Sequence, residues 1–281
     1  MVVVMGEEGV STSEKTIPIE DIGIIILDHQ QITITQALMA GLLANNTAII
    51  TCDGTHHPTG LMLNLDGHSL QSQKFQAQVE ATVPLKKQLW QQTITAKIQN
   101  QAAMLAFRRE ENKMLLSLAA SVKSGDSENC EAQAAVYYWK KVFPDTLNFY
   151  RDREGPPPNN LLNYGYAILR ALVARTLVGS GLLPTLGIHH RNQYNSYCLA
   201  DDIMEPYRPY VDYIVFQIIR TNGKYLEMSP SMKKALLEIP AMDVIIEGKK
   251  SPLMNAVQRT TASLAKCFEG TTRKILYPEF Q

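Results

Sequence analysis

The densest group of chemically capable side chains lies in residues 187–212, with the sequence GIHHRNQYNSYCLADDIMEPYRPYVD. These 26 residues hold two histidines, two arginines and four carboxylates. Asp202 and Glu205 are three positions apart, so on a helix both side chains share one face. Two carboxylates and an imidazole that converge on one point suit a divalent cation, because Mg²⁺ and Mn²⁺ prefer oxygen ligands and Mn²⁺ accepts imidazole more readily. The residue types therefore indicate a metal site in this stretch.

Structural roles account for the same residues from the sequence alone. A histidine after a glycine turn, such as His189, is typical of a hydrogen-bonded loop residue, and the carboxylates suit a solvated helix face. Arg208 can pair with Asp212 as scaffolding. The residue before a proline is pushed away from the α region, so Pro206 predicts that Glu205 lies at a helix end or a kink.

Other motifs are weaker. DGTHHPTG at 53–60 places two adjacent histidines among turn residues, and this favours a structural turn or an interface over a zinc site. The sequence contains no GxGxxG, GxxxxGK[ST] or GxSxG, so a P-loop and a serine-hydrolase elbow lack support. The four cysteines are far apart and form no CxxC pair, which favours reduced thiols in a cytosolic protein.

The elements that position these residues divide into two regions. Of the 281 residues, 45% are hydrophobic and 19% charged, as in a folded globular protein. β-branched runs and turn residues predict a small N-terminal β-rich domain over 1–70, with strands at 16–19, 23–28, 47–52 and 61–65 and a helix at 33–44. The opening MVVVM is too short for the core of a signal peptide, so nothing in it argues for export.

The remaining residues, 71–281, predict a larger all-α C-terminal domain, so the fold class is α+β. Three prolines at 156–158 cannot continue a helix, so they mark a boundary between helices. No apolar run approaches the roughly 18–20 residues of a membrane helix. Apolar spacing predicts helices at 85–120, 161–178 and 210–220, and a last one that starts at Ser251-Pro252 and ends at Gly270.

Charge is distributed unevenly although the net charge is zero. Residues 1–74 carry eight acids against two bases, whereas residues 75–123 carry seven bases against three acids. A basic segment of this kind suits either a polyanion on one face or a solvated helix surface.

Four blocks of the sequence resemble the integrase (adaptation endonuclease) subunit of CRISPR–Cas systems. They are residues 85–102, 128–143, 159–174 and 187–212, and the wording NQYNSY and LADDIMEPYRP is most similar to the type II branch. The similarity runs from about Thr16 to the C-terminal LYPEF. The resemblance implies an N-terminal β-domain and a C-terminal α-domain. Members of the family usually have a few more strands before the segment that matches Thr16, so the resemblance leaves two alternatives for residues 1–15: a native start or a truncated one.

The resemblance also implies the site and the partners. Its metal ligands correspond to Glu131, His190 and Glu205, with Asp202 as a possible additional acid, and they hold Mg²⁺ or Mn²⁺. Taken alone, Glu131 lies in the first turn of a helix, where a carboxylate simply offsets the helix dipole. The implied partners are double-stranded DNA, a second copy in a homodimer, a small ferredoxin-like adaptation subunit and other type II adaptation proteins, in the cytoplasm of a prokaryote.

The implied reaction is metal-dependent insertion of short DNA fragments into a repeat array, in which a 3′-hydroxyl attacks a phosphodiester. Two alternatives stay open: a stand-alone metal-dependent nuclease on branched DNA, and a non-enzymatic helical scaffold. The candidates for contacts with DNA phosphates, which surface solvation explains equally, are Lys86, Lys87, Lys97, Arg108, Arg109 and Arg170. Tyr164 and Tyr166 are candidates for lining the site, and ordinary core packing is the alternative for them.

Overall fold

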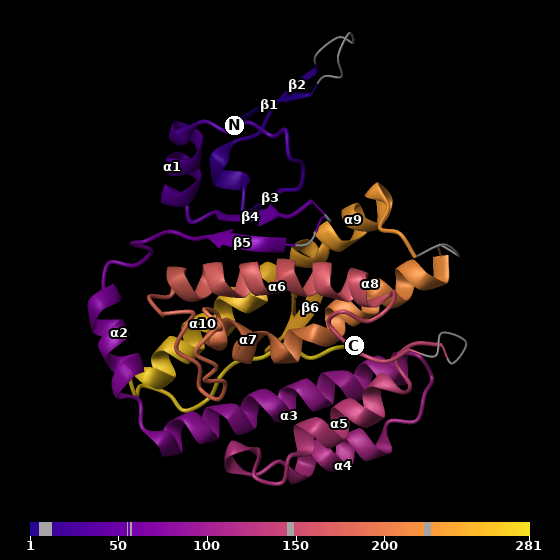
Figure 1. Ribbon diagram of the computed structural model, residues 1–281. Coiled ribbons are helices and arrows are strands. Elements are labelled where there is room, and N and C mark those ends of the chain that lie inside the picture. Colours follow the sequence, from indigo (N-terminus) through magenta and orange to yellow (C-terminus); the bar gives the residue numbers. More distant parts are fainter. Residues whose placement is uncertain (6–12, 55, 57, 145–148, 222–225) are drawn as a thin grey trace. The chain divides into compact units, whose positions relative to one another are not determined.

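The computed structural model describes residues 1–5, 13–54, 56, 58–144, 149–221 and 226–281 (Figure 1). The chain divides into two compact units, Met1–Gly67 and His68–Gln281. The first is a small unit with strands, and the second is larger and helical.

The N-terminal unit contains two small sheets. In one of them, strands β1 and β2 pair antiparallel. In the other, β4 lies between a parallel partner, β3, and an antiparallel partner, β5. Helix α1 forms the crossover between the two parallel strands, and the Thr35 hydroxyl caps it by accepting a hydrogen bond from the Leu38 backbone N–H at 3.2 Å. The elements are β1 (Val2–Met5), β2 (Ser13–Thr16), η1 (Ile19–Asp21), β3 (Ile24–Leu27), α1 (Gln36–Ala44), β4 (Ala48–Cys52) and β5 (Pro58–Met62).

Two predicted strands of this unit are corrected. Residues 16–19 do not form one strand, because β2 ends at Thr16 and Pro18 leads into the 3-10 turn η1. The strand expected at 61–65 lies earlier, at Pro58–Met62, since its pairing partner β4 sets the register. Leu65, which the apolar pattern placed in that strand, is 92% exposed.

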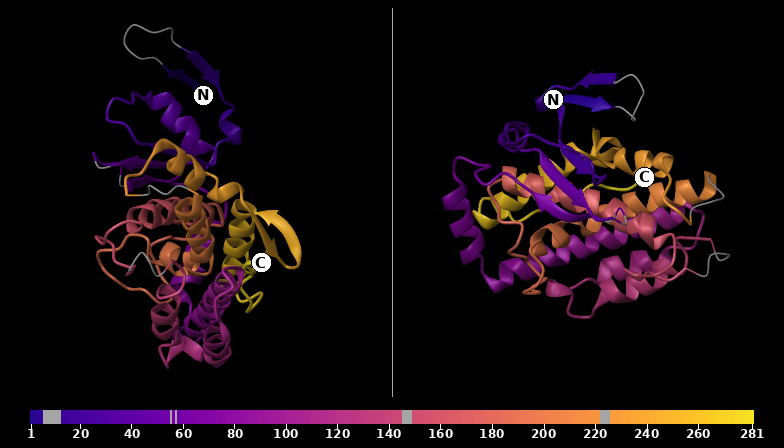
Figure 2. Two further views of the ribbon diagram at one scale, coloured as in Figure 1. Left: turned by 90° about the vertical axis from the view of Figure 1, so that its right-hand side faces the viewer. Right: turned by 45° about the horizontal axis from the view of Figure 1, so that its top comes forward.

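The C-terminal unit is built around helix α6, which is buried along most of its length as its apolar sequence predicts. Helices α7, α8, α9 and α10 pack against α6. Helices α3, α4 and α5 form a separate layer of this unit, in magenta tones in Figures 1 and 2. The helices are α2 (Gln71–Glu80), α3 (Val83–Phe107), α4 (Lys113–Ser121), α5 (Cys130–Trp139), α6 (Asn159–Gly179), α7 (Cys198–Met204), α8 (Arg208–Thr221), α9 (Pro230–Leu237) and α10 (Leu253–Phe268), with 3-10 turns η2 (Ser124–Asp126), η4 (Glu205–Tyr207) and η5 (Ile239–Ala241).

The helix expected over 85–120 is two helices. Helix α3 ends at Phe107, Arg109 adopts a left-handed conformation with φ of 60°, and α4 packs back against α3. The Asn112 side chain supports this turn, because its amide donates a hydrogen bond to the Ala102 carbonyl at 2.9 Å. The polar run RREEN at 108–112 interrupts the apolar stripe, which is why the chain can reverse there.

The C-terminal unit also departs from an all-α architecture at one antiparallel hairpin. Strands β6 (Asp243–Ile246) and β7 (Lys249–Pro252) pair directly, and Figure 2 shows them beside α10. Glu247 and Gly248 both have positive φ, of 51° and 70°, as a two-residue hairpin turn requires. In the described residues, no helix is long and apolar enough to cross a membrane.

Candidate active site

Glu131 lies in the first turn of α5. The Asp126 carboxylate caps this helix, because its two oxygens accept the backbone N–H groups of Cys130 at 2.8 Å and Glu131 at 3.0 Å. Asn129, between them, has a left-handed conformation that turns the chain into the helix. The cap holds the Glu131 backbone in place, and its side chain stays 25% exposed.

Glu205 lies at the junction of α7 and η4, at a helix end as Pro206 predicts. Its backbone nevertheless stays helical, with φ of −52° and ψ of −46°, because Pro206 occupies the first turn of the segment that follows. The residue is 5% exposed, and its Oε1 accepts a hydrogen bond from Arg208 Nε at 2.8 Å. Arg208 therefore pairs with Glu205, whereas the sequence suggested Asp212 as its partner.

His190 is held by Asp202, which is fully buried on α7. The imidazole Nδ1 lies 2.5 Å from Asp202 Oδ1, and the Asp202 carboxylate also accepts the backbone N–H groups of His189 at 2.9 Å and His190 at 3.3 Å. Gly187 makes this turn possible, since a Cβ there would lie 2.4 Å from the His190 carbonyl oxygen. A carboxylate on Nδ1 places the proton on that nitrogen, so Nε2 keeps a lone pair for a ligand.

Lys97 of α3 joins the two glutamates. Its Nζ lies 2.6 Å from Glu131 Oε1 and 2.6 Å from Glu205 Oε2. Both contacts are ion pairs, and the contact with Glu131 also has hydrogen-bond geometry. In the described part of the chain, no three His, Cys, Asp or Glu side chains gather closely enough to hold a metal in their present positions.

The charges of the site shift its pKa values in opposite directions. Burial raises the pKa of Glu205, but the Arg208 guanidinium and the Lys97 ammonium together lower it to about 2. The hydrogen bond with Asp202 raises the pKa of His190 against the effect of burial, and the charges of Glu205 and Glu131 raise it further. The charges of both glutamates thus act on His190, although in the described residues these three side chains do not form a metal cluster as they stand.

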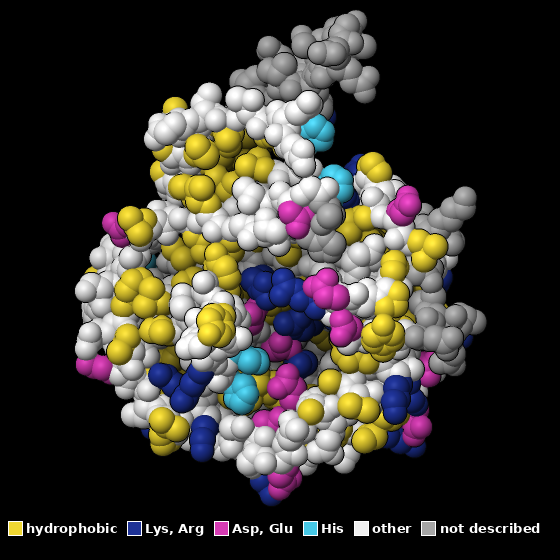
Figure 3. All heavy atoms as spheres, viewed as in Figure 1, with side chains coloured by type: hydrophobic (Ala, Val, Ile, Leu, Met, Phe, Trp, Pro, Cys, Tyr) yellow, Lys and Arg dark blue, Asp and Glu magenta, His cyan; other side chains and the backbone are white. Residues whose placement is uncertain are grey.

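Trp90, two turns before Lys97 on α3, forms the wall behind the histidines. Its ring stacks on His189 with centroids 4.1 Å apart and an interplanar angle of 3°, and it meets His190 edge-on at 5.6 Å. Trp90 is 1% exposed, so it is held by the core and supports the two imidazole rings from that side. On the face drawn in Figure 3, histidine, acidic and basic side chains gather in one area of the helical unit.

The predicted DNA contacts differ widely in exposure. Lys87 and Arg109 are exposed and Lys86 is half-buried. The side chain of Arg170 is 43% exposed, and its Nε lies 2.6 Å from Asp201 Oδ1. Lys97, by contrast, is buried with its ammonium between two carboxylates.

Three more of these candidates belong to the interior. Arg108 lies over the Phe216 ring at 5.0 Å, and it donates to the Lys141 carbonyl. Tyr164 is 2% exposed and Tyr166 is 6% exposed. The Tyr166 hydroxyl donates to Asp212, and the guanidinium of Arg208 lies 4.6 Å from its ring centre.

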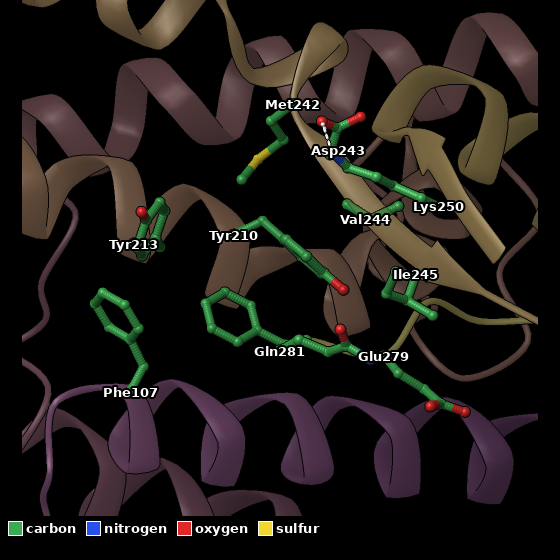
Figure 4. A pocket seen from close by; sticks show the side chains of 11 residues that line it. Phe107, Tyr210, Tyr213, Met242, Asp243, Val244, Ile245, Lys250, Glu279 and Gln281 are labelled. Atoms are coloured by element: carbon green, nitrogen blue, oxygen red, sulfur yellow. Dashed lines mark ion pairs between the residues drawn. The ribbon is translucent and has the colours of Figure 1, made fainter. Parts of the chain in front are cut away.

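Two hollows elsewhere in the chain contain none of the predicted ligands. In the N-terminal unit, His56 of the DGTHHPTG motif pairs with Asp28 at 2.9 Å beside a cavity of about 330 Å³. His57 lies outside the described residues. In the C-terminal unit, a cavity of about 240 Å³ lies between Phe107, Tyr210 and the β6 strand. Figure 4 shows its lining side chains, with the Asp243–Lys250 ion pair at the edge.

Sequence reasoning missed the roles of Lys97, Asp126 and Trp90. Lys97 carried a signal, because it falls on the apolar stripe of α3 beside Ile94 and Ile98, where an unpaired lysine is almost never buried. Asp126 also carried a signal, because an aspartate shortly before a helix start, here four residues before Cys130, is a common helix-capping residue. The stacking of Trp90 on a loop 99 residues later has no local signal.

Comparison with known proteins identifies the class. A model of the family described as CRISPR associated protein Cas1 matches residues 2–228. The CRISPR-associated endonuclease Cas1 of Neisseria meningitidis serogroup C (strain 8013) is 35% identical over 271 residues, which cover 94% of this chain and 87% of that protein. A CRISPR-associated endonuclease Cas1 of Pyrobaculum aerophilum is 27% identical over 230 residues, 78% of this chain and 77% of that protein. The chain therefore belongs to the Cas1 family.

Solved structures share its fold. A casposase bound to its integration product superposes with a TM-score of 0.79 and 22% identity, over 96% of this chain and 86% of that one. A Cas1 protein from Thermotoga maritima gives a TM-score of 0.73 and 15% identity, over 96% and 92%. The small N-terminal sheet unit and larger helical unit expected from the sequence are thus confirmed as the Cas1 fold.

Proposed function

We propose that this Cas1-family chain is a metal-dependent DNA endonuclease and integrase of CRISPR adaptation. It inserts short DNA fragments into a repeat array, and the attacking group is a free 3′-hydroxyl of the fragment. The observation that carries the proposal is the convergence of Glu131 from α5 and Glu205 from the end of α7 on one ammonium, beside the Asp202-held His190.

The side chains suit a hard divalent cation, Mg²⁺ or Mn²⁺. Glu205 Oε2 is buried and lies 2.6 Å from the Lys97 ammonium, so a positive charge already stands at this oxygen, as a metal ion would. Glu131, Glu205 and the free nitrogen of His190 supply two carboxylates and one imidazole. When bound, such an ion neutralises charge on the phosphate and lowers the pKa of the attacking hydroxyl.

The protein's own groups prepare the site. Arg208 keeps the Glu205 carboxylate ionised, and Asp202 fixes the tautomer and direction of His190. In the reaction, a bond forms between the 3′-oxygen and phosphorus while the bond to the leaving strand breaks, and the hydroxyl proton ends on the released 3′-oxygen. One phosphodiester replaces another, so no nucleotide cofactor is consumed.

The proposed assembly follows the relatives. One structural neighbour is described as a Cas6-RT-Cas1–Cas2 complex, with a TM-score of 0.70 and 20% identity over 89% of this chain and 31% of that one. We extend this to a homodimer that binds double-stranded DNA together with a small ferredoxin-like adaptation subunit and other type II adaptation proteins, in the prokaryotic cytoplasm. Lys86, Lys87, Arg109 and Arg170 remain the candidates for phosphate contacts, and binding through them should weaken steeply with salt.

A strand-transfer assay on a repeat-containing plasmid tests the function. The reaction contains the full chain, a short DNA duplex and Mg²⁺ or Mn²⁺, with and without the small partner subunit. We expect joined products that depend on the ion and disappear in Glu131→Gln. The matched control is Glu128→Gln, three residues before Glu131, which removes an exposed carboxylate that pairs with Lys123. Full activity of Glu131→Gln would refute the site.

A fragment with a blocked 3′ end separates joining from hydrolysis, since blocking stops integration and leaves cleavage by water intact. Cleavage that persists on branched DNA with the blocked fragment would favour the stand-alone nuclease. Behaviour that is independent of the metal and unchanged by His190→Ala would favour the scaffold.

A further inference from the structure

Lys97 is a charged residue on a buried face. It lies on α3 in line with Trp90 and Ile94, and it is 8% exposed. A lysine in such a place needs a counter-charge, because an isolated ammonium is strongly disfavoured away from water. Its two counter-charges come from different elements, Glu131 of α5 and Glu205 after α7.

The ammonium occupies the space between the two carboxylates. Each contact is 2.6 Å long, so Nζ stands where an ion bridging Glu131 Oε1 and Glu205 Oε2 would stand. A divalent cation at the usual distance of roughly 2.0–2.2 Å from such oxygens cannot coexist with an ammonium in the same gap, because both sterics and like charge oppose it. Arg208 does not compete for this gap, since it contacts the other oxygen of Glu205.

We propose that Lys97 is an internal competitor of the metal. In the absence of the ion its ammonium holds the two carboxylates together and balances their charge, and binding of the ion displaces it. This inference rests on the proposed function, because it takes Glu131 and Glu205 as ligands. Lys97 acts here as a positioning residue, and its presence lowers the affinity of the site for the metal while it stabilises the metal-free fold.

The side chain of lysine suits this task better than that of arginine. It is a point charge on a flexible four-carbon stem, so it can swing out of the gap without breaking a fixed bidentate geometry. Arg208, in contrast, is locked between Glu205 and the Tyr166 ring at 4.6 Å. The site thus contains one fixed cation and one that can leave.

Calorimetric titration of the full chain with Mn²⁺ alone tests the inference. The decisive variant is Lys97→Met, which keeps the length of the side chain and removes its charge, and Lys97→Gln serves if the Met variant does not fold. We expect Mn²⁺ to bind either variant at least tenfold more tightly than wild type, ~1.4 kcal/mol. The melting temperature without metal should fall, and the rise in melting temperature on adding Mn²⁺ should exceed that of wild type.

Two controls separate the possible failures. Lys123→Met removes a lysine from an exposed pair with Glu128 and should leave the Mn²⁺ affinity unchanged. Glu131→Gln should abolish tight binding in both the wild-type and the Lys97→Met backgrounds.

If Glu131→Gln abolishes binding but Lys97→Met leaves the affinity equal or weaker, the competitor role is wrong and the metal site stands. If Mn²⁺ binds equally well after Glu131→Gln, or binds neither wild type nor Lys97→Met, both proposals fail.

Discussion

Glu205 and Asp212 are two buried carboxylates seven residues apart whose surroundings differ in kind. Glu205 is 5% exposed and lies between two cations, Lys97 and Arg208. Asp212 is 1% exposed and accepts hydrogen bonds from the hydroxyls of Tyr138, at 2.8 Å, and Tyr166. The pKa of Glu205 is lowered to about 2 against burial, whereas burial raises that of Asp212 to about 6 against the two hydroxyls.

The difference shows that burial alone does not decide the charge of a carboxylate. The Arg208 and Lys97 charges paired with Glu205 outweigh desolvation there, whereas two hydroxyl donors and the charges of Arg208 and Arg151 do not outweigh it at Asp212. Glu205 therefore stays anionic and suits an ion, while Asp212 ties α5, α6 and α8 together through two tyrosines.

The largest expected effect comes from removing a ligand charge. Glu131→Gln and Glu205→Gln should each reduce strand transfer more than ~10³-fold, because several kcal/mol of transition-state stabilisation are lost.

The two variants should differ in their free energy of unfolding. Glu205→Gln leaves Arg208 and Lys97 poorly compensated in a buried site and should cost ~3 kcal/mol. Glu131 is one-quarter exposed, so its variant should lose less than ~1 kcal/mol. Urea unfolding measures this, and equal losses would contradict the contrast.

Asp212→Asn tests the second carboxylate by pH. An acid whose folded pKa is raised binds its proton more readily in the folded state, so its contribution to stability is present below pH 4 and is lost as pH rises through about 6. The free energy of unfolding of the variant relative to wild type should therefore rise between pH 4 and 8, by up to ~3 kcal/mol. Asp243→Asn, at an exposed carboxylate, is the control. If the difference in free energy of unfolding between Asp212→Asn and wild type does not change with pH, the raised pKa of Asp212 is wrong.

Asp202→Asn should weaken metal binding by roughly 10–100-fold, because the amide no longer enforces the proton on His190 Nδ1. Glu131 and Glu205 stay in place, so the site should still bind Mn²⁺ in a titration. An unchanged affinity would mean that His190 is not oriented by Asp202.

Tyr138→Phe should have the smallest effect. It removes one of the two hydroxyls on Asp212 and should cost ~1.5 kcal/mol at pH 8, where the acceptor is ionised. The loss should shrink at pH 5, where Asp212 is protonated. Strand transfer at 25 °C should stay within about twofold of wild type, since Tyr138 contacts none of the proposed ligands in the described structure. Unfolding curves at the two pH values provide the measurement.

Local patterns predicted most helices because apolar spacing and breakers act within a few residues. The central helix α6, the helix end at Glu205 and the start of the last helix after Pro252 follow from the sequence in this way. The split after Phe107 and the β6–β7 hairpin did not, because a polar run of five residues and a Glu-Gly turn are ambiguous until packing decides them.

The sequence by itself determined the family, since four blocks in order carry it. Through that resemblance it singled out Glu131, His190, Glu205 and Asp202 as residues to place. Only the tertiary structure decided what each of them touches. Lys97 was grouped with the DNA contacts, yet it lies between two glutamates 34 and 108 positions away in the chain. Charges interact through space rather than along the sequence, so the partners that set the state of a buried carboxylate cannot be read from its neighbours in the chain.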